Sequence, residues 1–275
     1  MAETLRLLSF LGYEEMMNHI EFDNWEDHWN NYANSAETNP AQRYRHQLVV
    51  RLIKKHNDDN CIRILDIGSG QGDLCAALQE SLPNSEVVGL ELSAIGVRIS
   101  QQKVPKVTFI TADILDPPDV LDKYAEWATH AVCSEVLEHV DDPVLFLQRV
   151  KTYLEPDGYL FLTVPGGKMS SFDHHIGHIR HFTRNLIEEV LKAAGFHVET
   201  IYRAGFPFFN LYRLVVILRG RKLIEDVKSG NKGFWASLST VTMKFFNMLF
   251  NFNLLGSPFG WQVIVVARKP GTCNH

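Results

Sequence analysis

The chain has 275 residues, of which 45% are hydrophobic and 21% charged, as expected for a globular protein with a substantial core. Its formal net charge of −5 gives no electrostatic reason to expect duplex nucleic acid as a partner. The N-terminal sequence lacks the pattern of a secretory or transit signal, and no two of the four cysteines are spaced as C-x-x-C. Together these features predict a cytoplasmic protein with reduced thiols.

The sequence predicts three regions in chain order. Residues 1–60 are expected to form an N-terminal helical cap. Residues 61–205 and 261–270 alternate between strand-like and helix-like apolar runs, which predicts a parallel α/β sheet with helices on both faces. Residues 206–260 are too long for an ordinary connection within such a sheet, and we expect a helical insert there.

The strongest local signal is a glycine-rich turn between the first predicted strand and the following helix, in the segment Ile64–Gly72. Gly68 and Gly70 permit a tight turn and a close approach of a ligand to the backbone, and Gly72 lets the helix pack near the strand. A G-x-G-x-G turn alone is a weak signal, because a strand-to-helix turn that binds no ligand can use the same glycines.

Carboxylates end three successive predicted strands, at Asp66, Glu91 and Asp113. The carboxyl ends of parallel strands line the crevice in which such sheets bind ligands, so we expect all three side chains to face it. A carboxylate at Glu91 can accept both hydroxyls of a ribose. Asp113 can contact an adenine amino group, or it can cap the turn that follows.

The stretch from Ile64 to Val164 resembles a class I S-adenosylmethionine (SAM)-dependent methyltransferase. It contains LDIGSGQG, VVGLELS, ITADILD, HAVCSEVLEHVDDP and LEPDGYLFLTVP in the order and spacing of that family. The resemblance implies a Rossmann-like seven-stranded sheet whose last strand is antiparallel. It also implies that SAM is the cofactor and that the protein is a methyltransferase.

The resemblance further implies which residues hold SAM. Asp66, Gly68 and Gly70 would surround its methionine part, Glu91 would bind the ribose, and Asp113 with Ile114 would flank the adenine. Tyr32 and Arg43 precede the sheet, in a region that often closes over the cofactor in this fold. The complete predicted cofactor set is Tyr32, Arg43, Asp66, Gly68, Ser69, Gly70, Gly72, Glu91, Leu92, Asp113, Ile114 and Glu135.

A second motif follows the fourth predicted strand, where Glu135, Glu138 and His139 are spaced i, i+3, i+4 and so share one face of a helix or turn. Two carboxylates and an imidazole can bind a divalent cation. The motif resembles that of the ubiquinone-biosynthesis O-methyltransferases and the small-RNA 2′-O-methyltransferases, which implies Mg²⁺ or a similar ion on these three residues. Metal-free methyltransferases carry the same motif, and there His139 can act as a general base or hold the loop.

Histidines are concentrated in the loop after Val164, and we expect His178 and His181 to lie near the substrate. A solvated polar loop is the alternative. Transfer of a methyl group to a hydroxyl requires removal of a proton, by a histidine or through a metal ion. These residues therefore favour O-methylation of a small-molecule hydroxyl. The alternatives are an RNA or protein methyltransferase, or a scaffold that binds SAM without catalysis.

The insert at 206–260 contains two long apolar runs and a basic cluster between them. Lys244, Asn247, Asn251 and Asn253 interrupt the second run, which disfavours a transmembrane span. We expect either a lid over the substrate pocket, a homodimer contact or a peripheral membrane element. An apolar lid favours an apolar, aromatic or lipid-like acceptor.

Overall fold

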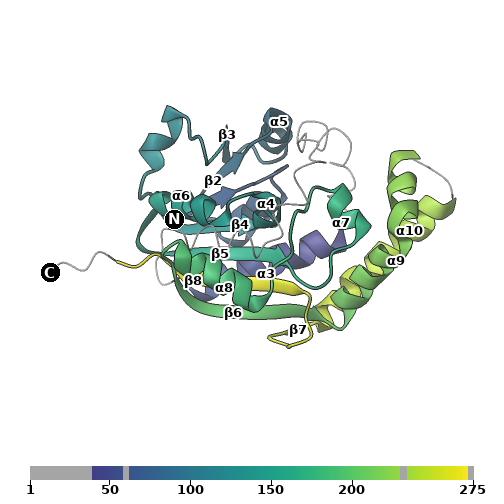
Figure 1. The fold of residues 1–275 in the computed structure, drawn as a ribbon. Coiled ribbons are helices and arrows are strands. Elements are labelled where there is room, and N and C mark those ends of the chain that lie inside the picture. Colours follow the sequence, from purple (N-terminus) through teal and green to yellow (C-terminus); the bar gives the residue numbers. More distant parts are fainter. Residues whose placement is uncertain (1–38, 58–61, 230–233, 272–275) are drawn as a thin grey trace.

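The computed structural model describes residues 39–57, 62–229 and 234–271, and the predictions for Tyr32 and for most of the N-terminal cap lie outside these residues. The described residues form one eight-stranded sheet, with the order β3-β2-β1-β4-β5-β8-β6-β7 (Figure 1). Its strands are β1 (Arg63–Ile67), β2 (Glu86–Glu91), β3 (Thr108–Thr111), β4 (Ala128–Ser134), β5 (Leu154–Pro165), β6 (His197–Phe206), β7 (Leu254–Leu255) and β8 (Gln262–Arg268).

Strands β1 to β5 pair in parallel, and β8 runs antiparallel between β5 and β6. This arrangement confirms the predicted α/β sheet with an antiparallel last strand. The sheet has one more strand than expected, because the two residues of β7 pair with the end of β6. Two residues are too few to show the alternating pattern by which a strand is recognised in a sequence.

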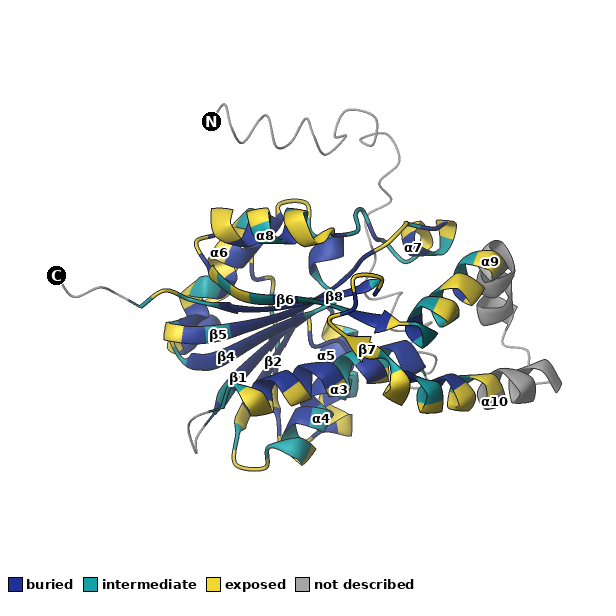
Figure 2. Cartoon of the chain, turned by 90° about the horizontal axis from the view of Figure 1, so that it is seen from below, coloured by how far each residue is buried: buried dark blue, intermediate teal, exposed yellow. Residues whose placement is uncertain are grey.

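Helices cover both faces of the sheet, as Figure 2 shows. Residues of β1 alternate between the two cores, so that Ile64 packs towards α3 and α4 while Leu65 packs towards α6 and α8. The α-helices are α3 (Pro40–Lys55), α4 (Asp73–Ser81), α5 (Ala94–Lys103), α6 (Pro143–Tyr153), α7 (Ser171–His175), α8 (Arg184–Ala193), α9 (Phe208–Ser229) and α10 (Phe234–Leu249). Short 3₁₀ helices are η1 (Asp119–Tyr124), η2 (Leu137–His139) and η3 (Phe250–Phe252).

Local signals in the sequence explain where α8 starts and stops. The Thr183 hydroxyl accepts a hydrogen bond from Leu186 N at 3.2 Å and caps the first turn. Gly195 follows the helix with φ +82°, a left-handed conformation that suits glycine at a helix end. This helix lies on the sheet and fixes the C-terminal end of the segment 166–183 between β5 and α8, which we call the histidine loop.

The predicted helical insert consists of α9 and α10, which lie side by side and project beyond the sheet (Figures 1 and 2). At the base of this hairpin the Tyr212 and Phe246 rings contact each other, with their centroids 5.3 Å apart. Tyr44 of α3 also packs on Phe209 and Phe250 there, so the base belongs to the core on the α3 side. Among the described residues, no helix has the length and apolar character needed to cross a bilayer.

Candidate active site

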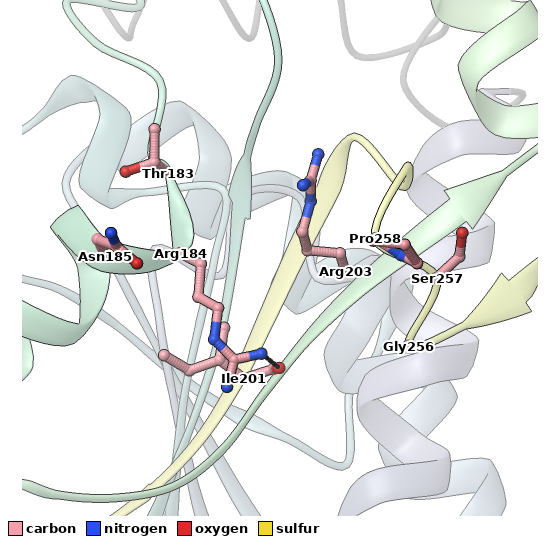
Figure 3. Close-up of a pocket in the computed structure, with 8 residues that line it drawn as sticks. All are labelled: Thr183, Arg184, Asn185, Ile201, Arg203, Gly256, Ser257 and Pro258. Atoms are coloured by element: carbon pink, nitrogen blue, oxygen red, sulfur yellow. Dashed lines mark hydrogen bonds between the residues drawn. The ribbon is translucent and has the colours of Figure 1, made fainter.

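One pocket of the structure, with a volume of about 450 Å³, lies between the start of α8 and the edge of the sheet (Figure 3). Two arginines line it, but both bind backbone carbonyls: Arg184 donates to Ile201 O at 3.1 Å and Arg203 to Gly260 O at 3.0 Å. None of the predicted site residues that the structure describes lines this pocket. The candidate site lies instead at the carboxyl ends of the parallel strands.

The glycine turn after β1 has the backbone conformation that its residues predict. Gly68, Gly70 and Gly72 have φ of +75°, +55° and +81°, which favours glycine at each position. The amides of Gly68 and Ser69 both donate to Leu90 O, at 2.8 and 2.9 Å, and so join the turn to β2. The Ser69 hydroxyl is buried and has no hydrogen-bond partner among the described residues, so it is available to a ligand.

We expect Gly68→Ala to lower the free energy of unfolding by more than the roughly 1–2 kcal/mol cost of a left-handed alanine. The added Cβ would lie 2.5 Å from Val136 Cγ2, so the neighbouring loop must also move. Gly256→Ala is the matched control, because Gly256 has φ +88° but no atom of the described residues within 4 Å of an added Cβ. Urea unfolding of both variants measures these losses. Equal losses of unfolding free energy in the two variants would show that Val136 moves aside without destabilising the protein.

The two carboxylates nearest the turn are buried and hold its surroundings in place. Glu91 accepts hydrogen bonds from Gly70 N at 2.8 Å and from Ser93 N at 3.0 Å, one on each oxygen. Asp66 accepts a hydrogen bond from the Cys75 thiol at 3.2 Å. Burial raises the pKa of Asp66 to about 7, even though the Cys75 hydrogen bond lowers it. Both side chains are thus at the turn, as their predicted roles require.

The third predicted carboxylate is in a different environment. Asp113 is exposed, and its Oδ1 accepts from Leu115 N at 2.8 Å, which closes the turn after β3. Of the two roles that the sequence predicts for Asp113, the structure thus has the cap on the following turn. Of the two apolar residues predicted beside the cofactor, Leu92 is exposed, whereas Ile114 is buried in the core.

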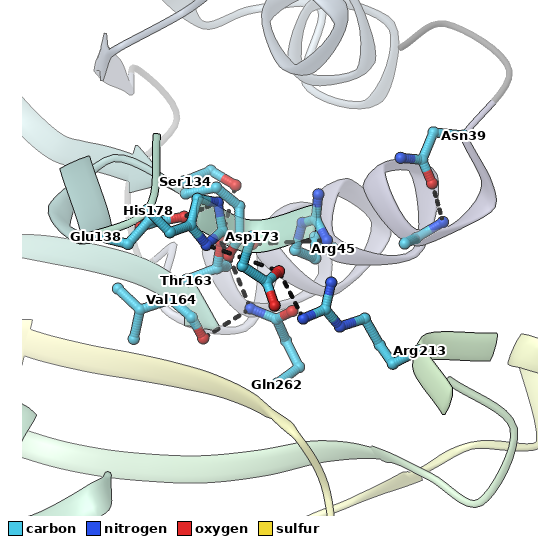
Figure 4. Close-up of polar contacts among 12 residues, drawn as sticks. Asn39, Arg45, Ser134, Glu138, Thr163, Val164, Asp173, His178, Arg213 and Gln262 are labelled. Atoms are coloured by element: carbon cyan, nitrogen blue, oxygen red, sulfur yellow. Dashed lines mark hydrogen bonds and ion pairs between the residues drawn. The ribbon is translucent and has the colours of Figure 1, made fainter. Parts of the chain in front are cut away.

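Glu135, directly after β4, is held by side chains that the sequence did not single out, and Figure 4 shows Arg45, Thr163 and Gln262 among them. Its Oε1 accepts from Thr163 Oγ1 at 3.0 Å and from Gln262 Nε2 at 2.8 Å. The Arg45 guanidinium lies 3.6 Å from its Oε2. Arg43, which the sequence did single out, is exposed on α3. One sequence signal could have indicated Gln262, because it is a polar residue directly before the apolar run 263–267 of β8.

Glu138 and His139 meet His178 of the histidine loop, and one ligand atom from each lies within 4.8 Å of the others. Glu138 is fully buried, and neither carboxylate oxygen has a hydrogen-bond partner among the described residues. Burial, followed by the nearby charge of Glu135, raises the pKa of Glu138 well above its ordinary value. Glu135 itself is not in this set, so the structure groups His178 with Glu138 and His139.

The His139 ring is oriented by the histidine loop. Its Nδ1 lies 3.0 Å from Gly177 O, and the carbonyl can only accept. Nδ1 therefore carries the hydrogen in the neutral ring, and Nε2 carries the lone pair. A lone pair on Nε2 equips His139 to take a proton or to bind a metal ion.

Asp173 of α7 organises the other side of the loop and forms a second group of ligand atoms with His178 and His181. Its carboxylate accepts from Arg213 of α9 at 2.8 Å and from the Ser170 hydroxyl at 2.7 Å. Burial raises the pKa of Asp173, but the Arg213 charge and the hydrogen bonds outweigh it and the net shift is downward. The sequence did not single out Asp173 or Arg213.

The two predicted substrate histidines are therefore adjacent, with His178 Nδ1 and His181 Nε2 3.3 Å apart. Burial lowers the pKa of His178 to about 2 and also lowers that of His181, which keeps both rings neutral. The other two histidines of the loop, His174 and His175, are exposed. Neutral imidazoles at the ends of β4 and β5 can exchange protons or bind a cation.

The sheet order, the glycine turn after β1 and the carboxylate at the end of β2 define a Rossmann-like ligand-binding domain. Residues 37–201 match the methyltransferase domain family, and the chain therefore belongs to this family. The match confirms the predicted resemblance to SAM-dependent methyltransferases.

Individual relatives agree with the family. Over 118 residues the chain is 32% identical to trans-aconitate 2-methyltransferase of Azoarcus sp. (strain BH72), covering 39% of this chain and 47% of that protein. Over 125 residues it is 29% identical to the ubiquinone biosynthesis O-methyltransferase of Paraburkholderia phymatum, covering 45% and 53%. The chain thus spans about half the length of the curated relatives it matches.

Solved structures share the fold at low sequence identity. A Haloferax volcanii methyltransferase, in complex with the Trm112 methyltransferase activator, matches with a TM-score of 0.61 and 16% identity, covering 92% of this chain and 99% of that one. Phosphoethanolamine N-methyltransferase 2 of Haemonchus contortus, in complex with SAM, matches with a TM-score of 0.53 and 20% identity, covering 82% and 52%.

Proposed function

We propose that the protein transfers the methyl group of SAM to a hydroxyl of an apolar, aromatic or lipid-like small molecule. The observation that carries the proposal is the cluster of the buried Glu138 and His178 with the half-buried His139. This cluster follows Val136, the residue that packs against Gly68 of the glycine turn. Two kinds of curated relative are O-methyltransferases by name, the ubiquinone biosynthesis enzyme and the malonyl-[acyl-carrier protein] enzyme. They support oxygen as the acceptor atom.

The residues of the glycine turn fit SAM. Gly68 and Gly70 carry the backbone around a tight turn with positive φ values, and the buried Ser69 hydroxyl lacks a hydrogen-bond partner among the described residues. Gly68, Ser69 and Gly70 would hold the methionine part, and Glu91 would bind the ribose hydroxyls. When bound, SAM supplies a methyl group activated by a sulfonium leaving group. The protein has to align the acceptor hydroxyl and exclude water.

His139 is the group that takes the proton from the acceptor hydroxyl. Its Nδ1–H is engaged by Gly177 O, so the proton arrives at Nε2. Burial raises the pKa of Glu138, which lies beside His139 in the cluster.

The same cluster fits a divalent cation, because Glu138 has two buried oxygens without hydrogen-bond partners among the described residues. Glu138, His139 and His178 would hold the ion, and the ion would lower the pKa of a bound hydroxyl. Glu135, which the sequence predicts as a ligand, would then lie outside the ligand set, where Thr163 and Gln262 donate hydrogen bonds to it. In this form of the proposal His139 is a ligand and not the base.

Calorimetry and chelation test the proposed function together. We expect SAM and S-adenosylhomocysteine to bind, and methyl transfer to phenols and other apolar alcohols to exceed transfer to the corresponding amines. Failure of both cofactors to bind at millimolar concentration would exclude methyl transfer. Full activity after EDTA treatment would assign the proton to His139 alone, whereas loss of activity restored by Mg²⁺ would assign it to the cation. Transfer to RNA or protein alone would overturn the small-molecule proposal.

A further inference from the structure

The outer side of α9 exposes a continuous row of apolar side chains. Leu211, Leu214, Val215 and Leu218 are all exposed, and Leu218 is 77% exposed. Their spacing of i, i+3, i+4 and i+7 places them on one face of the helix. We call these four residues the α9 apolar face. These apolar side chains are not buried against the other described residues, because α9 contacts its neighbours through other residues, such as Phe209 and Val216.

The α9 apolar face continues onto the loop that follows β7. Phe259 of this loop is 63% exposed and contacts the ring of Phe206, which is 36% exposed, at a centroid distance of 5.5 Å. Asn210 fixes the loop against α9, because its side chain donates to Phe259 O at 2.7 Å and accepts from Trp261 N at 3.0 Å. The exposed aromatic ring is therefore held in place at the base of the hairpin.

Helix α10 also turns apolar side chains outward. Phe245 and Met248 are each more than half exposed, whereas Phe246 packs inward against Tyr212 of α9. The hairpin thus packs Tyr212 against Phe246 at its base and exposes apolar residues of both helices. A helix that lies in a lipid interface buries its apolar face at the boundary between headgroups and acyl chains.

The charge of the insert differs in sign from that of the whole chain. Residues 206–260 contain seven lysines and arginines but two acidic residues, in a chain with a formal net charge of −5. On α9, Arg219, Arg221 and Lys222 come directly after the α9 apolar face in the sequence. An apolar helix face followed by basic residues is typical of helices that lie on anionic lipid.

We propose that the α9–α10 hairpin docks on the surface of an anionic lipid bilayer, with the α9 apolar face and Phe259 in the acyl boundary. Arg219, Arg221 and Lys222 would lie at the level of the anionic headgroups, whereas Arg213 stays paired with Asp173. The hairpin rests on the bilayer and does not cross it, in keeping with the lengths and compositions of the described helices. The proposal concerns lipid binding and holds whatever the methyl acceptor is.

Vesicle sedimentation of the full chain tests the docking. Vesicles of phosphatidylcholine with 30 mol% phosphatidylglycerol should bind the protein, and pure phosphatidylcholine should bind it more weakly by about fivefold for each basic residue engaged. The double variant Leu214→Glu/Leu218→Glu should bind the anionic vesicles at least about 100-fold more weakly, because each leucine contributes about tenfold or more when buried. Phe259→Glu provides a second variant, outside the helix.

Leu145→Glu is the matched control, because Leu145 is an exposed leucine of α6 on the sheet domain, far from the insert in the sequence. It should bind vesicles as the unchanged protein does. Each variant is first shown to be folded by circular dichroism and by SAM binding. Failure of the unchanged protein to bind anionic vesicles, or equal binding by the double variant, would overturn the proposal. A dimer in light scattering that the same double variant dissociates would instead assign the face to a second copy.

Discussion

Glu91→Ala is expected to weaken SAM binding by about 100-fold or more. A hydrogen bond to a charged group contributes about 1.5–3 kcal/mol, and Glu91 is proposed to make two of them to the ribose. The same substitution also removes the acceptor for Gly70 N and Ser93 N, so the turn that would cradle the cofactor loses its support. Calorimetric titration with SAM and with S-adenosylhomocysteine measures the effect.

Glu86→Ala is the control for this measurement, because Glu86 begins the same strand but is exposed at its far end. Its SAM affinity should equal that of the unchanged protein. Glu91→Gln separates the two contributions of Glu91, since the amide keeps one acceptor oxygen for a backbone amide. If Glu91→Ala bound SAM as tightly as the Glu86 variant does, Glu91 would have no role in holding the ribose.

His139→Ala should lower kcat for methyl transfer by roughly 10²–10⁴, the range that a positioned acid–base group contributes. SAM affinity should be unchanged, because His139 lies on η2 and its ring is held by Gly177 of the histidine loop. Steady-state kinetics together with calorimetry separate the two effects. A comparable loss is expected if His139 is a metal ligand, and the chelation experiment distinguishes these roles.

His174→Ala is the matched control, because it removes an exposed histidine of the same loop. We expect its kcat to stay within about twofold of the unchanged protein, in line with the small effects of most surface substitutions. If the His139 variant retained full kcat, proton removal would have to be assigned to another group. His178, which lies 4.8 Å from His139 between ring centroids, would be the next to test.

The parts of the fold that the sequence predicts are those that contiguous residues determine. The glycine turn, the alternating strands and the Thr183 cap are each specified within a dozen residues, and the structure has all three. The family motif could be recognised for the same reason, since it is a run of short segments. Leu254 and Leu255 were not predicted to form a strand, because their pairing with β6 depends on the tertiary structure.

The polar contacts around Glu135 could not be predicted in the same way. Gln262 donates to Glu135 across 127 residues of sequence, and such a pair leaves no spacing signal in either segment. Arg45, and not the predicted Arg43, faces Glu135 because of the rotation of α3, which is set by its packing on α4 and β5. The predicted set of metal ligands lacked His178 for the same reason. His178 comes near Glu138 and His139 only through the folding of the histidine loop.

The ion pair between Arg213 and Asp173 joins the insert to the histidine loop. Asp173 is buried beside His178 and His181, whereas Arg213 belongs to a helix whose opposite side is exposed. A ligand on that exposed side that favours one position of α9 would therefore change the affinity for an acceptor at the histidines. Thermodynamic linkage makes such an effect reciprocal, so the acceptor would change the affinity of the hairpin's ligand by the same factor. Arg213→Met would uncouple the two equilibria while leaving each ligand its own contacts.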